Sequence, residues 1–277
     1  MSRLVLSVAC RDQKGLITRI TELIFHHGGN IIENGEFVDL YDSRFYLRAV
    51  IDELQQVESF HAALAERLPD ARIRLSPLEP RPIVIMATTE AHCLGDLLIR
   101  AAFDDLPARV VGVISNHAVL GELTEAMKVP FFHLSHEGIS REQHEERIGR
   151  VIDELAPDFV VLAKYMRIFS PGFVARYPNR LLNIHHSFLP AFIGANPYRQ
   201  AWERGVKVIG ATAHYATEDL DEGPIIAQDV VSVDHNYSPE DMARYGRDVE
   251  KRVLARALRF VLEDRVFVNG NKTIVFE

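Results

Sequence analysis

The hydrophobic and polar positions of residues 3–77 predict a small unit built from four strands and two helices. Residues 3–10 form a short run rich in β-branched side chains, which is typical of a strand. After the polar stretch that ends at Gly15, apolar residues recur at helical spacing, and a second helical pattern covers residues 59–68. Further strand-like runs cover residues 30–41, 44–52 and 71–77. The predicted order is therefore β-α-β-β-α-β.

Beyond residue 83 the pattern changes to nearly all-apolar runs separated by helical stretches. Such runs are expected of parallel strands that are buried on both faces of a sheet. They cover residues 83–89, 110–115, 159–165 and 181–186. An extended segment, an amphipathic helix over about residues 239–263 and a hairpin at Asn269-Gly270 complete the chain. This half predicts a doubly wound α/β domain with a mostly parallel sheet, in which active sites lie outside the carboxyl ends of the strands.

Three prolines within residues 77–82 indicate a linker between these two patterns. We therefore predict a ferredoxin-like domain over residues 1–78, a linker over 79–82 and an α/β domain over 83–277.

Composition narrows the possible partners. With 47% apolar and 25% charged residues the chain is expected to fold rather than to be disordered. A formal charge of -8 gives no basic field for nucleic acid or an anionic membrane, and no apolar run reaches the roughly 18 residues of a membrane span. Cys10 and Cys93 form no CxxC pair, so we expect two buried thiols rather than a disulfide or a zinc site. A cytoplasmic location is the default expectation.

An asparagine and two adjacent histidines close the apolar run at residues 181–186. Strand alternation places Asn183 and His185 on one face and His186 on the other. A carboxylate follows at Asp221, in a Leu-Asp-Glu-Gly-Pro turn whose glycine and proline fix the backbone. Asn183 and His185 can stabilise an oxyanion. Asp221 can either accept a proton as a base or orient the imidazole. Without an obvious cysteine or serine nucleophile, these residues predict attack on a formyl or acyl carbonyl by water or by an amine.

Three motifs resemble the folate-dependent formyltransferase superfamily. They are NIHHSFLPAF at residues 183–192, YMRIFSP at 165–171 and GATAHYATEDLDEGPII at 210–226. The spacing of 36 residues between His185 and Asp221 is also similar to that family's. The resemblance covers roughly residues 83–277 and implies that Asn183, His185 and Asp221 act on the formyl group of 10-formyltetrahydrofolate.

Within this superfamily the chain is most similar to the deformylases, which hydrolyse 10-formyltetrahydrofolate to formate and tetrahydrofolate. Residues 1–78 resemble the ACT domain of that group, and HHSFLPAF followed by GANPY resembles its sequence, where glycinamide ribonucleotide formyltransferases read HPSLLP. Those transferases bind the acceptor's phosphate on a Gly-Asn/Ser-Gly loop. This chain reads TTEAHCLGDLL there, with a negative charge at Glu90 and only Gly95 as a glycine. Water is therefore the expected nucleophile.

The resemblance implies an enzyme that supplies formate and balances one-carbon folate pools for purine biosynthesis. It also implies a small-molecule folate substrate, no further cofactor, no metal and a homo-oligomer, either a dimer or a tetramer. Two alternatives stay open: formyl transfer to an amine such as glycinamide ribonucleotide, and a non-catalytic folate or amino-acid sensor.

The resemblance also assigns a folate site, in which the backbone of the 166–169 loop binds the pterin. Phe169 stands where many relatives have leucine, and Lys164 is a candidate for contact with the glutamate tail. His186 either orders water beside the site or packs in the interior, and His214 is either a site residue or a buried structural histidine. The expected folate-binding residues are Met166, Arg167, Ile168, Phe169, Thr217 and Leu220.

ACT domains frequently bind small amino acids near a glycine in the first turn. By that resemblance Asp12, Gly15 and Asn30 are candidates for binding an effector such as glycine or methionine. Gln13-Lys14 stands where relatives usually have Arg-Pro, so the turn before Gly15 lacks the rigidity of a proline.

Overall fold

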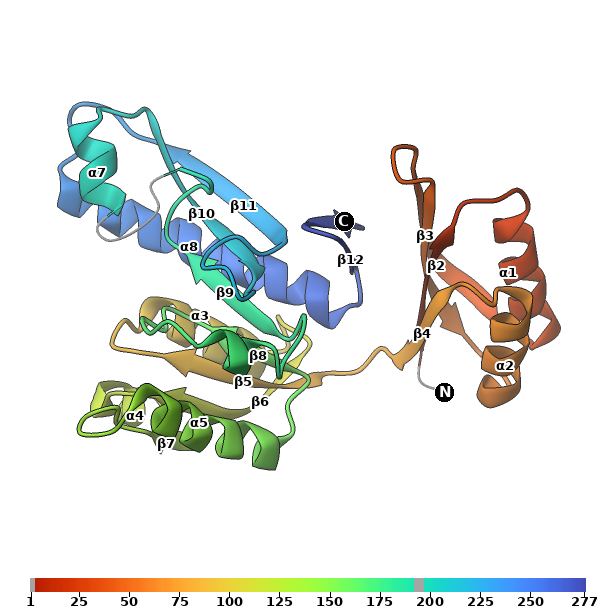
Figure 1. Cartoon of the computed structure of the whole chain (residues 1–277), viewed down its shortest axis with the longest axis horizontal. Coiled ribbons are helices and arrows are strands. Elements are labelled where there is room, and N and C mark those ends of the chain that lie inside the picture. Colours follow the sequence, from red (N-terminus) through yellow and green to blue (C-terminus); the bar gives the residue numbers. More distant parts are fainter. Residues whose placement is uncertain (1–2, 192–196) are drawn as a thin grey trace. The chain divides into compact units, whose positions relative to one another are not determined.

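The computed structural model describes residues 3–191 and 197–277, which form two compact units (Figure 1). The first unit contains Met1–Glu79, and the second contains Pro80–Leu262 and Val268–Thr273. Two C-terminal segments, Glu263–Phe267 and Ile274–Glu277, belong to the first unit, although the sequence predicts one domain over 83–277. Residues 192–196, which include the first three residues of the GANPY stretch, lie outside the described residues.

Side-chain contacts within the first unit explain why the C-terminal segments group with it. The Phe267 ring meets the Tyr46 ring edge-on with 5.5 Å between centroids, and Arg265 Nη1 lies 2.9 Å from Glu33 Oε1. These are long-range contacts of residues that follow a helix of the other unit, so chain order alone does not predict them.

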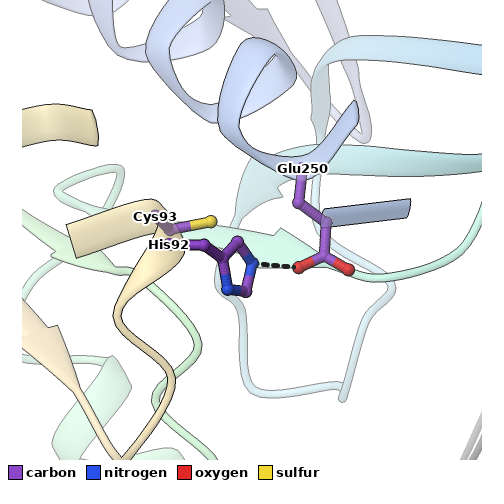
Figure 2. Close-up of side chains that lie close together, drawn as sticks. All are labelled: His92, Cys93 and Glu250. Atoms are coloured by element: carbon purple, nitrogen blue, oxygen red, sulfur yellow. Dashed lines mark hydrogen bonds and ion pairs between the residues drawn. The ribbon is translucent and has the colours of Figure 1, made fainter. Parts of the chain in front are cut away.

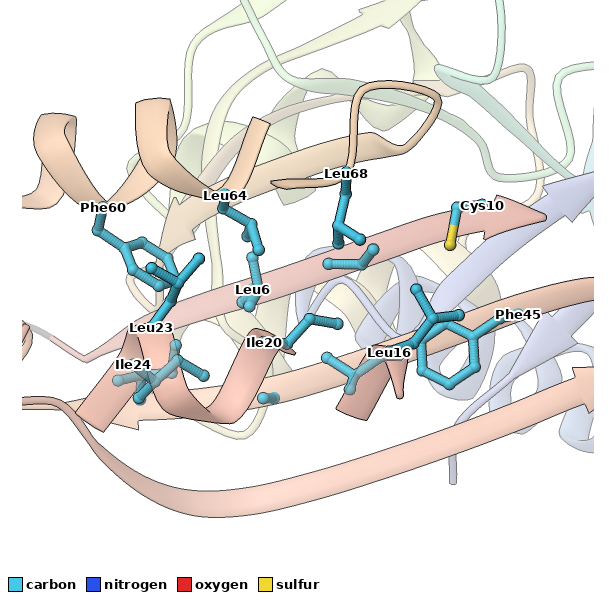
Figure 3. Packing of buried hydrophobic residues seen from close by; sticks show 14 of the residues in the cluster. Leu6, Cys10, Leu16, Ile20, Leu23, Ile24, Phe45, Phe60, Leu64 and Leu68 are labelled. Atoms are coloured by element: carbon cyan, nitrogen blue, oxygen red, sulfur yellow. The ribbon is translucent and has the colours of Figure 1, made fainter. Parts of the chain in front are cut away.

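The first unit is an antiparallel sheet with two helices on one face, as the sequence predicts. Its strand order is β2-β3-β1-β4. The helices contribute one side of a core that includes Leu6, Ile20, Phe45 and Phe60, all at most 2% exposed (Figure 3). The elements are β1 (Leu4–Arg11), α1 (Leu16–His26), β2 (Asn30–Asp39), β3 (Arg44–Asp52), α2 (Val57–Arg67) and β4 (Arg72–Pro77).

The second unit contains a seven-stranded sheet in the order β11-β10-β9-β8-β5-β6-β7. The five strands from β9 to β7 are parallel, whereas β10 runs antiparallel to both of its neighbours. The strands are β5 (Arg81–Ala87), β6 (Ala108–Ser115), β7 (Phe131–His133), β8 (Phe159–Leu162), β9 (Leu181–His185), β10 (Val208–Tyr215) and β11 (Ile225–Ser232). The predicted doubly wound, mostly parallel sheet is confirmed.

Helices cover both faces of this sheet, and apolar side chains alternate between them. Val84 and Met86 of β5 pack in one core cluster with Ile148 and Ile152 of α5 (Arg141–Leu155), so Ile83 and Ile85 point to the opposite face. None of the described helices is both long and apolar enough to cross a membrane. The helices are α3 (His92–Ala102), α4 (Gly121–Ala126), α5 (Arg141–Leu155), α6 (Pro171–Val174), α7 (Pro197–Glu203) and α8 (Pro239–Leu262); a short hairpin follows, β12 (Val266–Asn269) and β13 (Lys272–Val275).

The parallel register brings the ends of three central strands to one level. Met86 of β5 pairs with Leu162 of β8, and Leu162 pairs with Asn183 of β9. The polar residues that follow these strands therefore emerge side by side at the carboxyl edge. Both cysteines are free and buried, as expected from their spacing.

Candidate active site

A carboxylate, two imidazoles and an amide lie together on β9, β10 and the loop after β10. His185 Nδ1 lies 3.2 Å from Asp221 Oδ2, and His214 Nε2 lies 3.6 Å from Asp221 Oδ1. Asn183 Nδ2 lies 3.1 Å from His214 Nε2, because Asn183 and His214 are paired across the two strands. The residues singled out by the sequence motifs thus form one contiguous group, and His214 is part of it.

The loop after β10 places Asp221 through a constrained backbone. Asp221 itself has a φ of 58°, a conformation that costs free energy for a residue with a side chain. The loop is tied to the end of β10, where the Tyr215 amide donates to the Pro224 carbonyl at 3.0 Å. A Cβ on Gly223 would lie 1.8 Å from the Tyr215 carbonyl oxygen, so only glycine fits this close approach.

We therefore expect Gly223→Ala to lower turnover by about a hundredfold, because moving Asp221 by about 1 Å misplaces a catalytic group. The measurement is steady-state kinetics with the folding of the variant checked by thermal unfolding. Gly172→Ala is the matched control, since Gly172 is exposed, has no positive φ and has nothing within 4 Å of its Cβ position. Full activity in Gly223→Ala would contradict the role of this close approach.

The hydrogen bonds of His214 define its tautomer. Its Nδ1 lies 2.9 Å from the Tyr215 carbonyl oxygen, which can only accept, so Nδ1 carries the hydrogen. The Asn183 amide nitrogen can only donate, so one of its N–H groups points to Nε2 of His214. The second N–H of this amide can be donated to a ligand oxygen.

The electrostatics of the group keep Asp221 ionised. Burial alone would raise the pKa of this carboxyl group, but its interactions with His185 and His214 outweigh burial and lower the pKa below its usual value. The carboxylate is therefore available as a proton acceptor, and it fixes the orientation of the His185 ring.

The second ring nitrogen of His185, Nε2, differs from the other polar atoms of the catalytic group in its hydrogen bonding. Among the described residues, Nε2 of His185 is buried and has no hydrogen-bond partner. A buried polar atom normally has a hydrogen-bond partner. Because the His185 ring lines a cavity, a ligand in that cavity can supply this partner. The arrangement is an imidazole held by a carboxylate on one side and available to a ligand on the other.

Strand alternation predicts that His186 points away from His185, but the structure shows the two side chains together. β9 ends at His185, so the alternation ends there, and the two rings stack with 5.2 Å between centroids. Burial, together with the charges of Lys164 and His185, lowers the pKa of His186 to about 4. His186 is thus a neutral ring stacked on His185 at neutral pH.

One cavity of about 720 Å³ receives all of these side chains. Its volume is in the range of small-molecule sites. The exposed apolar side chains of Met166, Ile168 and Leu220 lie around it, as a flat heterocycle requires. The predicted residues that line it are Asn183, His185, Asp221, His186, His214, Met166, Arg167, Ile168, Phe169, Thr217 and Leu220.

The loop at residues 166–169 is held at both ends. The Met166 amide donates to Thr88 Oγ1 at 2.8 Å, and the Ser170 amide donates to Glu145 Oε1 at 2.6 Å. The Phe169 ring stacks on that of Phe173 with 4.3 Å between centroids. Contacts within the chain therefore hold this part of the cavity wall in place.

Further polar residues line the same cavity, among them Glu90, Lys164, Tyr198 and Glu250. Lys164 is only 5% exposed, and its ammonium lies 3.5 Å from Glu250 Oε2, which disfavours the expected contact with a glutamate tail. Tyr198 and Glu250 were not identified from the sequence. The available signal was the position of Glu250 on the apolar face of the predicted helix, between Gly246 and Leu254.

The three residues predicted to bind an effector do not lie together within the first unit. Asp12 and Gly15 lie between β1 and α1, and Gly15 has a φ of 83°. Asn30 pairs with Asp52 at the opposite end of the sheet, since Arg11 pairs with Arg44. They therefore cannot form one contiguous site within a single copy.

The chain is similar to several known proteins over most of its length. Residues 81–258 match the formyl transferase family. The chain is 54% identical to a formyltetrahydrofolate deformylase of Escherichia coli O6:H1, over 99% of both chains. The crystal structure of a formyltetrahydrofolate deformylase from Pseudomonas syringae is 43% identical, with a TM-score of 0.96 over 100% of this chain and 95% of that one. A glycinamide ribonucleotide transformylase from Symbiobacterium toebii is 33% identical, with a TM-score of 0.69 over 72% of this chain and 95% of that one.

Proposed function

Since the chain belongs to the formyl transferase family and, within it, to the formyltetrahydrofolate deformylases, we propose that it hydrolyses 10-formyltetrahydrofolate to formate and tetrahydrofolate. It is an enzyme, a hydrolase that acts on the C–N bond of a formyl group. Its product would supply formate and balance the one-carbon folates used in purine biosynthesis.

One observation of the site carries the mechanism. His185 contacts Asp221 through Nδ1, and its buried Nε2 has no partner among the described residues. An imidazole oriented by a carboxylate and open to a ligand is the arrangement used in general acid–base catalysis. The neighbouring Asn183 amide adds a donor for an oxyanion.

In the proposed reaction the oxygen of a water molecule forms a bond to the formyl carbon. Asp221, which the site keeps ionised, accepts the proton that water loses. Asn183 and His185 stabilise the negative charge on the former carbonyl oxygen. The C–N10 bond then breaks, N10 takes up a proton, and formate and tetrahydrofolate leave.

The folate is expected to bind against the loop at residues 166–169 and against Thr217 and Leu220. The support for this pose is that these side chains line the same cavity as Asp221 and that several of them are apolar and exposed. This side of the cavity suits a pterin ring.

The test is to incubate the purified chain with 10-formyltetrahydrofolate and no acceptor. We expect formate and tetrahydrofolate to form in equal amounts. Formate is measured by a formate assay, and tetrahydrofolate by the absorbance of the folate. Turnover that begins only after glycinamide ribonucleotide is added would favour formyl transfer instead. Folate binding without turnover under either condition would favour a sensor.

We also propose a role for the first unit, an assembly state and a location for this chain. The first unit would act as an ACT-like regulatory or oligomerisation domain, with glycine or methionine as effector and a dimer or tetramer as the assembly. The positive φ of Gly15, with open space at its Cβ position, supports a ligand near the first turn, whereas the distant position of Asn30 argues against its part in the same pocket. We also propose a cytoplasmic location, and a reaction without cofactor or metal.

A further inference from the structure

A second group of charged and polar side chains has no role in the proposed reaction, and all of its members except His92 line the catalytic cavity. Its members come from five segments of the second unit. They are Glu90 before α3, His92 at its start, Lys164 after β8, Tyr198 of α7 and Glu250 of α8. We call them the Glu250 network.

Glu250 is the centre of this network, and it is 1% exposed. Its Oε2 lies 2.7 Å from His92 Nε2 and 3.5 Å from the Lys164 ammonium, and the Tyr198 hydroxyl donates to Oε1. Helix α8 makes room for the tyrosine at Gly246, where a Cβ would lie 2.1 Å from the hydroxyl oxygen. Burial would raise the pKa of Glu250, but the hydrogen bond from His92 and the charge of Lys164 lower it to about 2.

The network is better explained as an ionic cluster than as a metal centre. His92, Cys93 and Glu250 place three potential ligand atoms within 4.8 Å of one another (Figure 2). However, the Lys164 ammonium already faces this carboxylate as its cation, and burial raises the pKa of the Cys93 thiol, which favours its protonated form. A metal ion would be repelled by that ammonium.

Lys164 connects the network to the catalytic group. Lys164 and the catalytic residues line the same cavity, and the charge of Lys164 acts on His186, whose ring stacks on that of His185. Lys164 also has a φ of 63° although it is not glycine. Such strain persists where the surroundings hold the residue for a function. Asp221 has the same kind of backbone, and both residues line the cavity.

The positions of these charges suggest which ligands the wall excludes. The Lys164 ammonium lies between Glu250 at 3.5 Å and Glu90 at 3.9 Å, so its charge is largely compensated. An anionic acceptor would meet the carboxylates of Glu90 and Glu250 at this wall. The fold itself does not exclude acceptors, because this unit is similar to a glycinamide ribonucleotide transformylase.

We propose that Lys164, held by Glu250 and Glu90, determines specificity by keeping amine acceptors away from the formyl group, so that water is the nucleophile. The inference rests on the hydrolysis proposed above. The lysine side chain lines the same cavity as His185, and it takes up space there that the body of an amine would need. Water needs no such space.

The test uses Lys164→Gly with glycinamide as a small amine probe. Glycine tolerates the positive φ, so the substitution removes the side chain without straining the backbone. In the transfer reaction the amine nitrogen bonds to the formyl carbon, the C–N10 bond breaks, and the proton lost by the amine is taken up at N10. Formate and N-formylglycinamide are both quantified by NMR, with an enzyme-free blank subtracted.

We expect the ratio of N-formylglycinamide to formate to rise by about tenfold or more in Lys164→Gly, a change typical of an altered pocket contact. Lys128→Gly is the matched control, because Lys128 is an exposed lysine with a φ of 59°. It should keep the wild-type ratio.

A folded Lys164→Gly variant that releases formate at an unchanged ratio would overturn the proposal. A folded variant that releases neither product would also overturn it, since Lys164 would then serve the reaction itself. If Lys164→Gly does not fold, the same assay is run on Glu90→Gly, and the same outcomes support or overturn the proposal. This variant is expected to fold because the Glu90 side chain is 43% exposed. Absence of formate release by the wild-type chain would instead contradict the proposed function.

Discussion

Replacing Asp221 with asparagine is expected to lower the turnover number by about a thousandfold, within the range for loss of a general base. The asparagine side chain keeps the size of the carboxylate and can still contact His185, but it cannot accept a proton from water. Folate binding should change little, since the apolar wall around Met166 and Leu220 remains intact.

Two measurements separate loss of chemistry from loss of binding. Single-turnover formate release reports the chemical step, and titration with tetrahydrofolate reports affinity. Asp219→Asn is the matched control, because Asp219 lies in the same loop with an exposed side chain. Unchanged turnover in Asp221→Asn would refute the assignment of the base, and an equal loss in Asp219→Asn would point to a general disturbance of the loop.

The pH dependence of turnover should reflect the lowered pKa of Asp221. Because the pKa of Asp221 is lowered by His185 and His214 against the effect of burial, the carboxylate stays ionised below the usual range of a carboxyl group. Protonation of Asp221 should therefore not reduce turnover between pH 7 and about pH 4, near the ordinary Asp value. Any acid-side loss in that interval must come from another group, and it should persist when the Asp219→Asn control is titrated.

Sequence patterns predicted the fold well where a local signal reports burial. The β-α-β-β-α-β order and the parallel apolar strands of the second unit are both confirmed. The C-terminal segments were misplaced because Phe267 contacts Tyr46 far away in the sequence, and no local pattern encodes that contact.

The candidate site could be assembled from motifs because its main residues follow strand ends. Asn183, His185 and His214 are brought together by the pairing of β9 with β10. Strand alternation was wrong for His186, because the strand ends one residue earlier. Glu250 could not be recognised as a site residue, since its partners Lys164 and Tyr198 come from other segments and only the fold brings them together.

The stacked histidines should differ sharply in their contribution to turnover. Comparing substitutions at the two positions tests which of them takes part in the reaction. We expect His185→Gln to lower turnover by about a thousandfold, because glutamine cannot both contact Asp221 and present a ligand-facing nitrogen that exchanges protons. His186→Gln keeps the contact of 3.2 Å between His185 and Asp221, so its loss should be at least about tenfold smaller.

Single-turnover formate release on both variants makes the comparison, with His133→Gln as an exposed control at the end of β7. Equal losses in the two variants would mean that the neutral His186 ring takes part in proton transfer. In that case the stacked pair, rather than His185 with Asp221, would be the unit that acts on the formyl group. A larger loss in His185→Gln alone would leave His186 as the ring that holds His185 in place between Asp221 and the substrate.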